Sequence, residues 1–119
     1  MSIDKLTTAG SVNNRIFKID RHGKYANFLS WLSPKKKSDL SRVDLVEVIS
    51  IEMGMSHPRF AKKKSKITNG EHRCVTITYG KDIKGKTLCL IFDKVVTKEL
   101  FVTGLQYFIV LKNNKDPEK

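Results

Sequence analysis

The fold is decided by residues 72–111, HRCVTITYGKDIKGKTLCLIFDKVVTKELFVTGLQYFIVL. Two runs rich in β-branched and apolar residues, 72–79 and 86–92, flank the polar and glycine-containing KDIKG. Such a polar insert between two strand-like runs is typical of a hairpin loop. The first half of this stretch therefore predicts a β-hairpin.

The second half of the stretch predicts a helix. Asp93 is a suitable N-cap, and three large hydrophobes recur at the i, i+4, i+7 spacing of one helical face, namely Phe101, Leu105 and Phe108. Lysines fall on the other sides, at positions 94, 98 and 112. Residues 107–111 are also compatible with a buried strand, but the apolar pattern is longer than a strand usually is. Gly104 is unfavourable in a helix unless it lets a sheet approach closely.

Working outward, the rest of the chain shows short alternating runs and polar connections. Strands are predicted at 3–8, 15–19, 25–32 and 45–53, the last with a possible bulge. The turn-like 9–14 and the basic, proline-containing 33–39 separate them, and 54–70 is a long basic segment without periodicity. The pattern predicts a mostly β domain of six or seven antiparallel strands, forming a small barrel or two packed sheets capped by the C-terminal helix.

Length and charge limit what the domain can be. The 119 residues suffice for one modest core, so we expect a single domain over 1–112 and a flexible tail over 113–119. The 23 Lys and Arg residues outnumber the 12 Asp and Glu residues, which gives a net charge of +11. This balance indicates an anionic partner: nucleic acid, an anionic membrane or an acidic protein.

The cysteines and the N-terminus indicate an intracellular domain. A turn centred near Ile83 sets Cys74 opposite residues near 92, several positions past Cys89, so a disulfide between the two cysteines is not expected. The N-terminal MSIDKLTTAG lacks the apolar run of a signal peptide, and no long uncharged apolar run predicts a membrane span.

We find no catalytic constellation in the sequence. The three histidines are scattered among polar segments without zinc-ligand spacing, and no phosphate-binding glycine loop or nucleophile elbow is present. We therefore expect neither an enzyme nor a bound metal or cofactor. What remains is a basic binding surface in three groups: Lys5 with Arg15, residues 35–37, and residues 59–66.

With these elements placed, the sequence resembles a pleckstrin homology domain, and more narrowly the N-terminal domain of phospholipase C of the delta type. The resemblance is carried by RIFKI at 15–19, WLSPKKK at 31–37, EVISIEMG at 47–54, HPRF at 57–60, RCVTITY at 73–79, LCLIF at 88–92 and FVTGL at 101–105. It implies a seven-stranded, strongly bent antiparallel barrel or sandwich capped by the C-terminal helix. It also implies a membrane-targeting role through phosphoinositide head groups.

The resemblance further implies where a head group would bind. Lys5 and Arg15 match ligand-binding positions on the first hairpin, and Lys35 and Lys36 match the basic pair after the third strand. Thr7 stands where the family has a second lysine, and Phe101 stands where it has a helix tryptophan. Accessory contacts are expected from Thr7, Lys18, Lys37, Lys62, Lys63 and Lys64.

The departures from the family pattern leave two functions open. The first is low-selectivity binding of anionic lipids by a monomeric domain, peripheral at the cytoplasmic face of a membrane. The second is a protein-interaction role on the same scaffold, because residues 7–14 lack the expected bases. Specific nucleic-acid binding is not expected, because exposed aromatics do not interleave with the basic runs.

Overall fold

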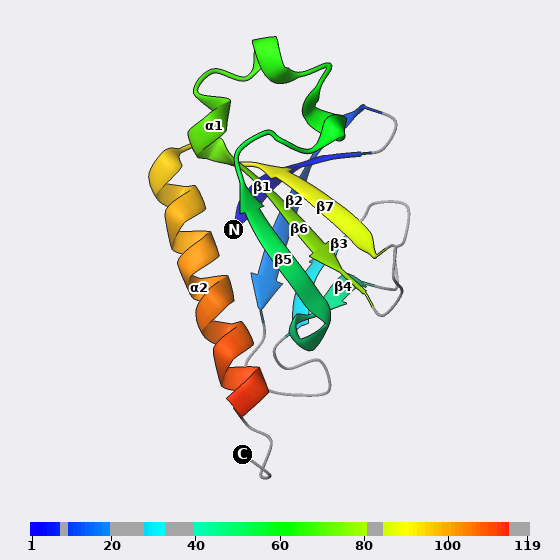
Figure 1. Ribbon diagram of the computed structural model, residues 1–119, viewed down its shortest axis with the longest axis vertical. Coiled ribbons are helices and arrows are strands. Elements are labelled where there is room, and N and C mark those ends of the chain that lie inside the picture. The colour runs from blue at the N-terminus through cyan, green and yellow to red at the C-terminus, as the bar shows by residue number, and fades with distance from the viewer. Residues whose placement is uncertain (8–9, 20–27, 33–39, 81–84, 115–119) are drawn as a thin grey trace.

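The structure is a computed structural model that describes residues 1–7, 10–19, 28–32, 40–80 and 85–114. Seven antiparallel strands form one sheet in the order β4-β3-β2-β1-β7-β6-β5. Their bounds are β1 Ser2–Leu6, β2 Val12–Ile19, β3 Phe28–Leu32, β4 Leu40–Asp44, β5 Val48–Met53, β6 Cys74–Tyr79 and β7 Lys86–Ile91. The helix α2, Val95–Asn114, packs along the bent sheet (Figure 1).

The bend of the sheet lies within β2. Residues 12–16 of β2 pair with β1, whereas residues 17–19 pair with β3. The strand therefore leaves one half of the sheet and enters the other, and the edge strands β4 and β5 close no barrel. The predicted mostly β architecture of seven strands and one C-terminal helix is confirmed in the form of this open, strongly bent sheet.

The hairpin of β6 and β7 confirms the predicted register. Cys74 lies opposite Ile91, and Cys89 lies opposite Thr76, so the two cysteines are diagonal neighbours. Both cysteines are free and buried. Burial raises the pKa of the Cys74 thiol to about 11, since an apolar environment disfavours the thiolate.

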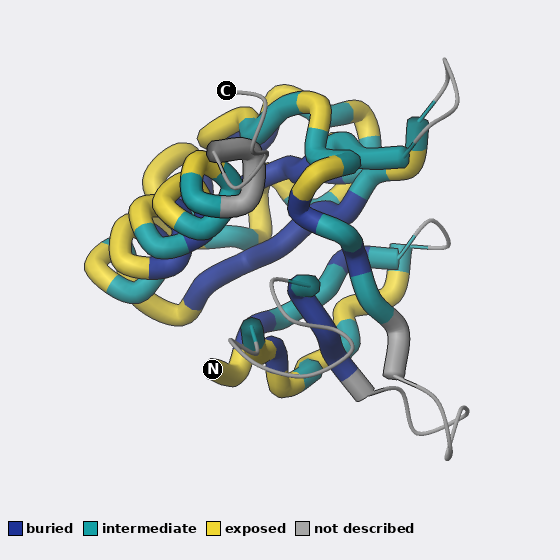
Figure 2. The backbone as a smooth tube through the Cα atoms, turned by 90° about the horizontal axis from the view of Figure 1, so that it is seen from below, coloured by how far each residue is buried: buried dark blue, intermediate teal, exposed yellow. Residues whose placement is uncertain are grey.

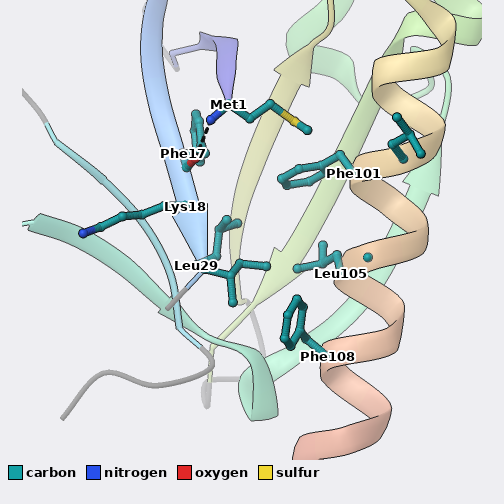
Figure 3. Close-up of a pocket in the computed structure, with 10 residues that line it drawn as sticks. Met1, Phe17, Lys18, Leu29, Phe101, Leu105 and Phe108 are labelled. Carbon is teal, nitrogen blue, oxygen red and sulfur yellow. Dashed lines mark hydrogen bonds between the residues drawn. The ribbon is translucent and has the colours of Figure 1, made fainter. Parts of the chain in front are cut away.

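The main core lies between the two halves of the sheet and α2. Phe101 is 8% exposed and Leu105 is fully buried, and the ring of Phe101 packs 5.2 Å from that of Phe92, centroid to centroid. Figure 3 shows Phe101, Leu105 and Phe108 pointing from α2 toward the sheet, with Phe17 and Leu29 on the facing side. The predicted inward face of the helix is therefore confirmed.

A second core covers the other face of β1, β7 and β6. It contains Leu6, Cys74, Cys89 and Ile91 from the strands, covered by Met55, Phe60 and Ile67 from the connection between β5 and β6. This connection, 54–73, contains two short 3-10 helices, η2 Pro58–Phe60 and η3 Lys64–Lys66, and the one-turn helix α1 Gly70–Arg73. We call residues 54–70 the flap. The flap was predicted as a long loop, and its apolar residues make it a structural cover.

Several boundaries differ from those predicted by the sequence. β2 begins at Val12, inside the segment read as a turn, and β4 at 40–44 was not predicted. Residues 45–47 form a 3-10 helix, η1, because the Asp44 carboxylate caps it by accepting from the Val46 amide at 3.1 Å. The bulge expected in β5 is present as a register shift between Val48 and Ser50.

Helix α2 differs from its prediction in three details. It begins at Val95, one position later than an Asp93 cap implies. Lys98 is only 9% exposed, on the buried side where no lysine was expected. The expected close approach of the sheet at Gly104 is wrong, because no heavy atom of the described residues lies within 4 Å of a Cβ built there. None of the helices in the described residues is long and apolar enough to cross a membrane.

Candidate functional site

The turn between β1 and β2 is closed by Thr7. Its amide donates to the Ser11 carbonyl at 2.9 Å, and its Oγ1 accepts from the Ser11 amide at 3.1 Å. Gly10, with φ of +90°, donates to the Thr7 carbonyl at 3.0 Å. Thr7, predicted as an accessory contact, thus has its hydroxyl engaged in shaping the hairpin that carries the candidate site.

The two first-ranked cationic residues lie on the same face of this hairpin. Lys5 pairs with Asn13, and Arg15, two residues further along β2, pairs with Ile3. Directly paired residues share a face, and diagonal neighbours lie about 7–8 Å apart, within reach of long side chains. The register therefore brings Lys5 and Arg15 together, as the resemblance implies.

Lys5 is held over an aromatic ring. Its Nζ lies 5.8 Å from the ring centroid of Trp31, which is 6% exposed and packs on Phe17 at 5.1 Å between centroids. A cation over an indole face gains about 0.5–2 kcal/mol, depending on exposure. Sequence reasoning missed this contact. Trp31 lies one residue before the end of β3, and this end of the strand is the one nearest the first hairpin. The position of Trp31 in its strand was therefore the sequence signal for a contact with this hairpin.

Arg15 is half-buried, and its Nη1 donates to the Asn14 carbonyl at 2.7 Å. A guanidinium has five N–H donors, and the contact with the Asn14 carbonyl uses one of them. Lys5 and Arg15 thus supply two cationic groups beside an aromatic wall. Such a pair suits phosphate or carboxylate oxygens, which accept charge-assisted hydrogen bonds.

The remaining predicted residues are not part of this pair. Lys18 is exposed on the opposite face of β2 from Arg15 and points away from α2 in Figure 3. Lys62, Lys63 and Lys64 lie on the flap, over the face of the sheet opposite to Lys5. The predicted contacts Lys35, Lys36 and Lys37 lie outside the described residues.

The flap is fixed to the sheet by Arg59. Its Nη2 donates to Thr87 Oγ1 at 2.7 Å, and its Nη1 lies 3.4 Å from the Thr87 carbonyl and 3.5 Å from the Leu6 carbonyl. The flap also has a titratable cap, because the Arg59 amide donates to His57 Nδ1 at 3.0 Å. Arg59 was grouped with the basic residues of a binding surface, and the structure gives its guanidinium partners on β1 and β7.

A cavity of about 360 Å³ lies at the end of β6 that contains Tyr79. Its charged lining residues are Arg42, Lys86, Asp44 and Glu47. Two bases and two acids give no net attraction for an anion. Within the described residues, no group of three His, Cys, Asp or Glu side chains could hold a metal ion. Among these features, the Lys5–Arg15 face remains the best candidate for anion binding.

Comparisons with known proteins identify the fold. No protein-family model matches the sequence, and no curated protein does. Among solved structures, PLC21 of S. officinalis matches with a TM-score of 0.69 and 19% identity, covering 91% of this chain and 15% of that chain. PLC21 of L. pealei matches with a TM-score of 0.69 and 18% identity at the same coverage.

A third match comes from a different kind of protein. The inner membrane complex sub-compartment protein 3 of Toxoplasma gondii has a TM-score of 0.62 and 16% identity, covering 98% of this chain and 77% of that chain. This chain spans only 15% of the length of either PLC21. At such identities the likeness concerns the fold. Together with the seven-stranded bent sheet and its C-terminal helix, it shows that the chain has a pleckstrin homology-like fold.

Proposed function

We propose that the domain is a non-catalytic membrane-targeting module that binds phosphoinositide head groups, or other anionic lipids, at the β1–β2 end of its sheet. The observation that carries this proposal is the shared face of Lys5 and Arg15 beside Trp31. The site would place the domain peripherally at the cytoplasmic face of a membrane. The net charge of +11 adds a long-range attraction to anionic surfaces.

The binding should be moderate and sensitive to salt. Each Lys or Arg held near an anionic leaflet contributes about 1 kcal/mol, and this contribution falls off within a Debye length. Lys5 and Arg15 on the first hairpin would supply specificity for a phosphate group, because both can donate charge-assisted hydrogen bonds to its oxygens. The exposed lysines of the flap would add only diffuse attraction.

The test compares two charge-matched double variants. Lys5→Gln/Arg15→Gln removes the candidate site, and Lys18→Gln/Lys62→Gln removes two exposed charges elsewhere. We expect the first variant to bind phosphatidylcholine vesicles containing phosphatidylinositol bisphosphate roughly 30-fold more weakly than the unchanged protein. The control variant should lose several-fold less. Co-sedimentation measures both.

Two further arms separate the sources of binding. Phosphatidylserine vesicles of equal surface charge report attraction to any anionic membrane, and competition by a soluble inositol phosphate reports head-group recognition. Equal losses in the two double variants would refute a localised site. Absence of vesicle binding by the unchanged protein would refute the membrane role itself.

The alternative role, protein docking on the same fold, also has support in the structure. Four large hydrophobic side chains are exposed on the outer face of α2, more than half of each being accessible: Val96, Leu100, Tyr107 and Val110. This face lies on the side of α2 away from the sheet, whereas the hairpin of β1 and β2 extends on the other side of the sheet from α2 (Figure 1). A docking function there would be compatible with lipid binding at the hairpin.

A further inference from the structure

We infer that the outer face of α2 is the contact surface of a homodimer, in which the α2 helices of two copies pack antiparallel. The proposal does not depend on lipid binding. It differs from the monomer expected from the sequence, because the exposure of this face became apparent only in the structure.

The outer face is a continuous apolar stripe. Val96, Leu100, Thr103, Tyr107 and Val110 follow one another at spacings of 4, 3, 4 and 3, which is the spacing of a helix-pairing seam. The exposed fractions of its large side chains are 58% for Val96, 65% for Leu100, 58% for Tyr107 and 55% for Val110. Figure 2 shows exposed residues along the side of α2 that faces away from the sheet.

The charge pattern favours a second copy as the occupant. Between Val95 and Leu111 the only basic residue is Lys98, which is 9% exposed on the buried side, and the only acidic residue is Glu99. Two copies, each carrying +11, repel each other across most surfaces. On α2 they can approach without opposing lysines. Helices that lie on membranes instead carry Lys and Arg beside their apolar face, and this stripe carries none.

The midpoint of the stripe supplies an independent observation. Gly104 interrupts a 20-residue helix, where glycine is destabilising relative to alanine. Of the described residues, none places a heavy atom within 4 Å of a Cβ built at Gly104, so the packing described within one copy does not require a glycine. Small residues do allow two helices to cross closely. Thr103 is such a small residue at the middle of the stripe. Gly104 lies on the flank of the stripe, where it lines a cavity of about 200 Å³ between α2 and strands β2 and β3.

An antiparallel pair centred between Thr103 and Gly104 is self-complementary. Leu100 of one copy then lies opposite Tyr107 of the second copy, and Val96 lies within one position of Val110 of the second copy. Each contact occurs twice, as a two-fold interface requires. The seam spans four to five residues of each helix and is smaller than a standard interface, so we expect dissociation in about the micromolar range.

Sedimentation equilibrium of the full chain across this concentration range tests the dimer. We expect a monomer–dimer equilibrium, and at least tenfold weaker association for Leu100→Gln/Tyr107→Gln. The matched control is Ile16→Gln/Val46→Gln, which removes two exposed apolar side chains elsewhere, 69% and 52% accessible. It should associate like the unchanged protein. Circular dichroism checks that each variant remains folded.

Cross-linking tests the orientation of the helices. The two native cysteines are buried. A disulfide that forms between two copies on mild oxidation therefore involves the introduced surface cysteine. Thr103→Cys lies near the two-fold axis and should cross-link. Val96→Cys should not, because two such residues lie about 22 Å apart in an antiparallel pair at 1.5 Å per residue.

Four results would overturn the proposal. They are a monomer at every concentration, equal weakening in the two double variants, cross-linking of Val96→Cys without Thr103→Cys, and loss of vesicle binding in Leu100→Gln/Tyr107→Gln with unchanged self-association. The last result would make the stripe a membrane surface. A monomer that binds a different protein through the stripe would likewise replace the second copy as its occupant.

Discussion

At the scale of single residues, the structure gives several polar side chains a different role from the one their type suggests. Arg59 belongs to a basic segment, yet its guanidinium contacts Thr87 and the Leu6 carbonyl and holds the flap. Lys5 is a surface-type residue, but it lies over the buried Trp31. Both contacts became apparent only in the structure, because the folded sheet brings segments together that are distant in the chain.

His57 makes the flap sensitive to pH. Burial, followed by the neighbouring charge of Arg59, lowers the pKa of His57 from 6.5. The unfolded chain therefore takes up this proton first as pH falls. The contribution of neutral His57 to folding is complete above pH 6.5, and it is lost as pH falls through the lowered pKa of the folded state.

We expect His57→Asn to remove this component of the pH dependence while retaining a side-chain acceptor at the cap. Urea unfolding at pH 7.5 and pH 5.0 should show a smaller loss of stability in the variant than in the unchanged protein. Equal losses in the two proteins would show that His57 does not couple pH to the flap.

At the scale of secondary-structure elements, the sequence predicts what depends on local periodicity. The β6–β7 hairpin and the inward face of α2 are confirmed because alternation and the i, i+4, i+7 pattern are properties of short stretches. The start of β2 at Val12 was not visible, since VNN has little β propensity and its pairing with β1 decides its conformation. The flap as a cover for Leu6 was hidden because Phe60 lies far from Leu6 in the chain.

The candidate site was predictable to a similar degree. Lys5 and Arg15 follow from the resemblance, and alternation in β2 already separates Lys18 from Arg15. The contact of Lys5 with Trp31 depends on the bend within β2, which no local pattern encodes. The exposed stripe of α2 was not predicted, because the spacing of Phe101, Leu105 and Phe108 identifies only the apolar face that the core uses.

Two glycines should respond in opposite ways to alanine. Gly104→Ala adds helix propensity in open space, so we expect stabilisation of about 1 kcal/mol. Gly85 has φ of +61°, and a Cβ there would lie 3.2 Å from both the Thr78 Cγ2 atom and the Tyr79 carbonyl oxygen. Gly85→Ala should destabilise the β6–β7 turn by about 1 kcal/mol or more.

Urea unfolding measures both changes, at protein concentrations low enough to keep the chain monomeric. Destabilisation by Gly104→Ala under these conditions would show that the glycine is needed within a single copy. That outcome would remove one of the supports for the dimer.

At the scale of the whole molecule, the hairpin that carries the proposed lipid site and the outer face of α2 lie at opposite sides of the domain. In Figure 1, α2 lies on the left of the sheet with its outer face pointing away from it, and the hairpin of β1 and β2 extends at the upper right. Two copies joined face to face through α2 would therefore present their hairpins at opposite ends. A planar membrane could bind only one end of such a dimer at a time.

The domain should consequently bring anionic vesicles together. We expect the turbidity of a vesicle suspension to rise on addition of the unchanged protein. Leu100→Gln/Tyr107→Gln should bind vesicles without clustering them, and Lys5→Gln/Arg15→Gln should both bind and cluster them much more weakly than the unchanged protein. Clustering by the first variant at the level of the unchanged protein would contradict a bridge through α2.

The buried cysteines beneath the flap allow the opening of the flap to be measured. Cys74 and Cys89 are fully covered, and the thiolate of Cys74 is disfavoured at neutral pH. A thiol reagent can reach them only while the cover is lifted. The rate at which a thiol reagent labels the native protein therefore measures how often the flap opens. The two native cysteines make an introduced probe unnecessary.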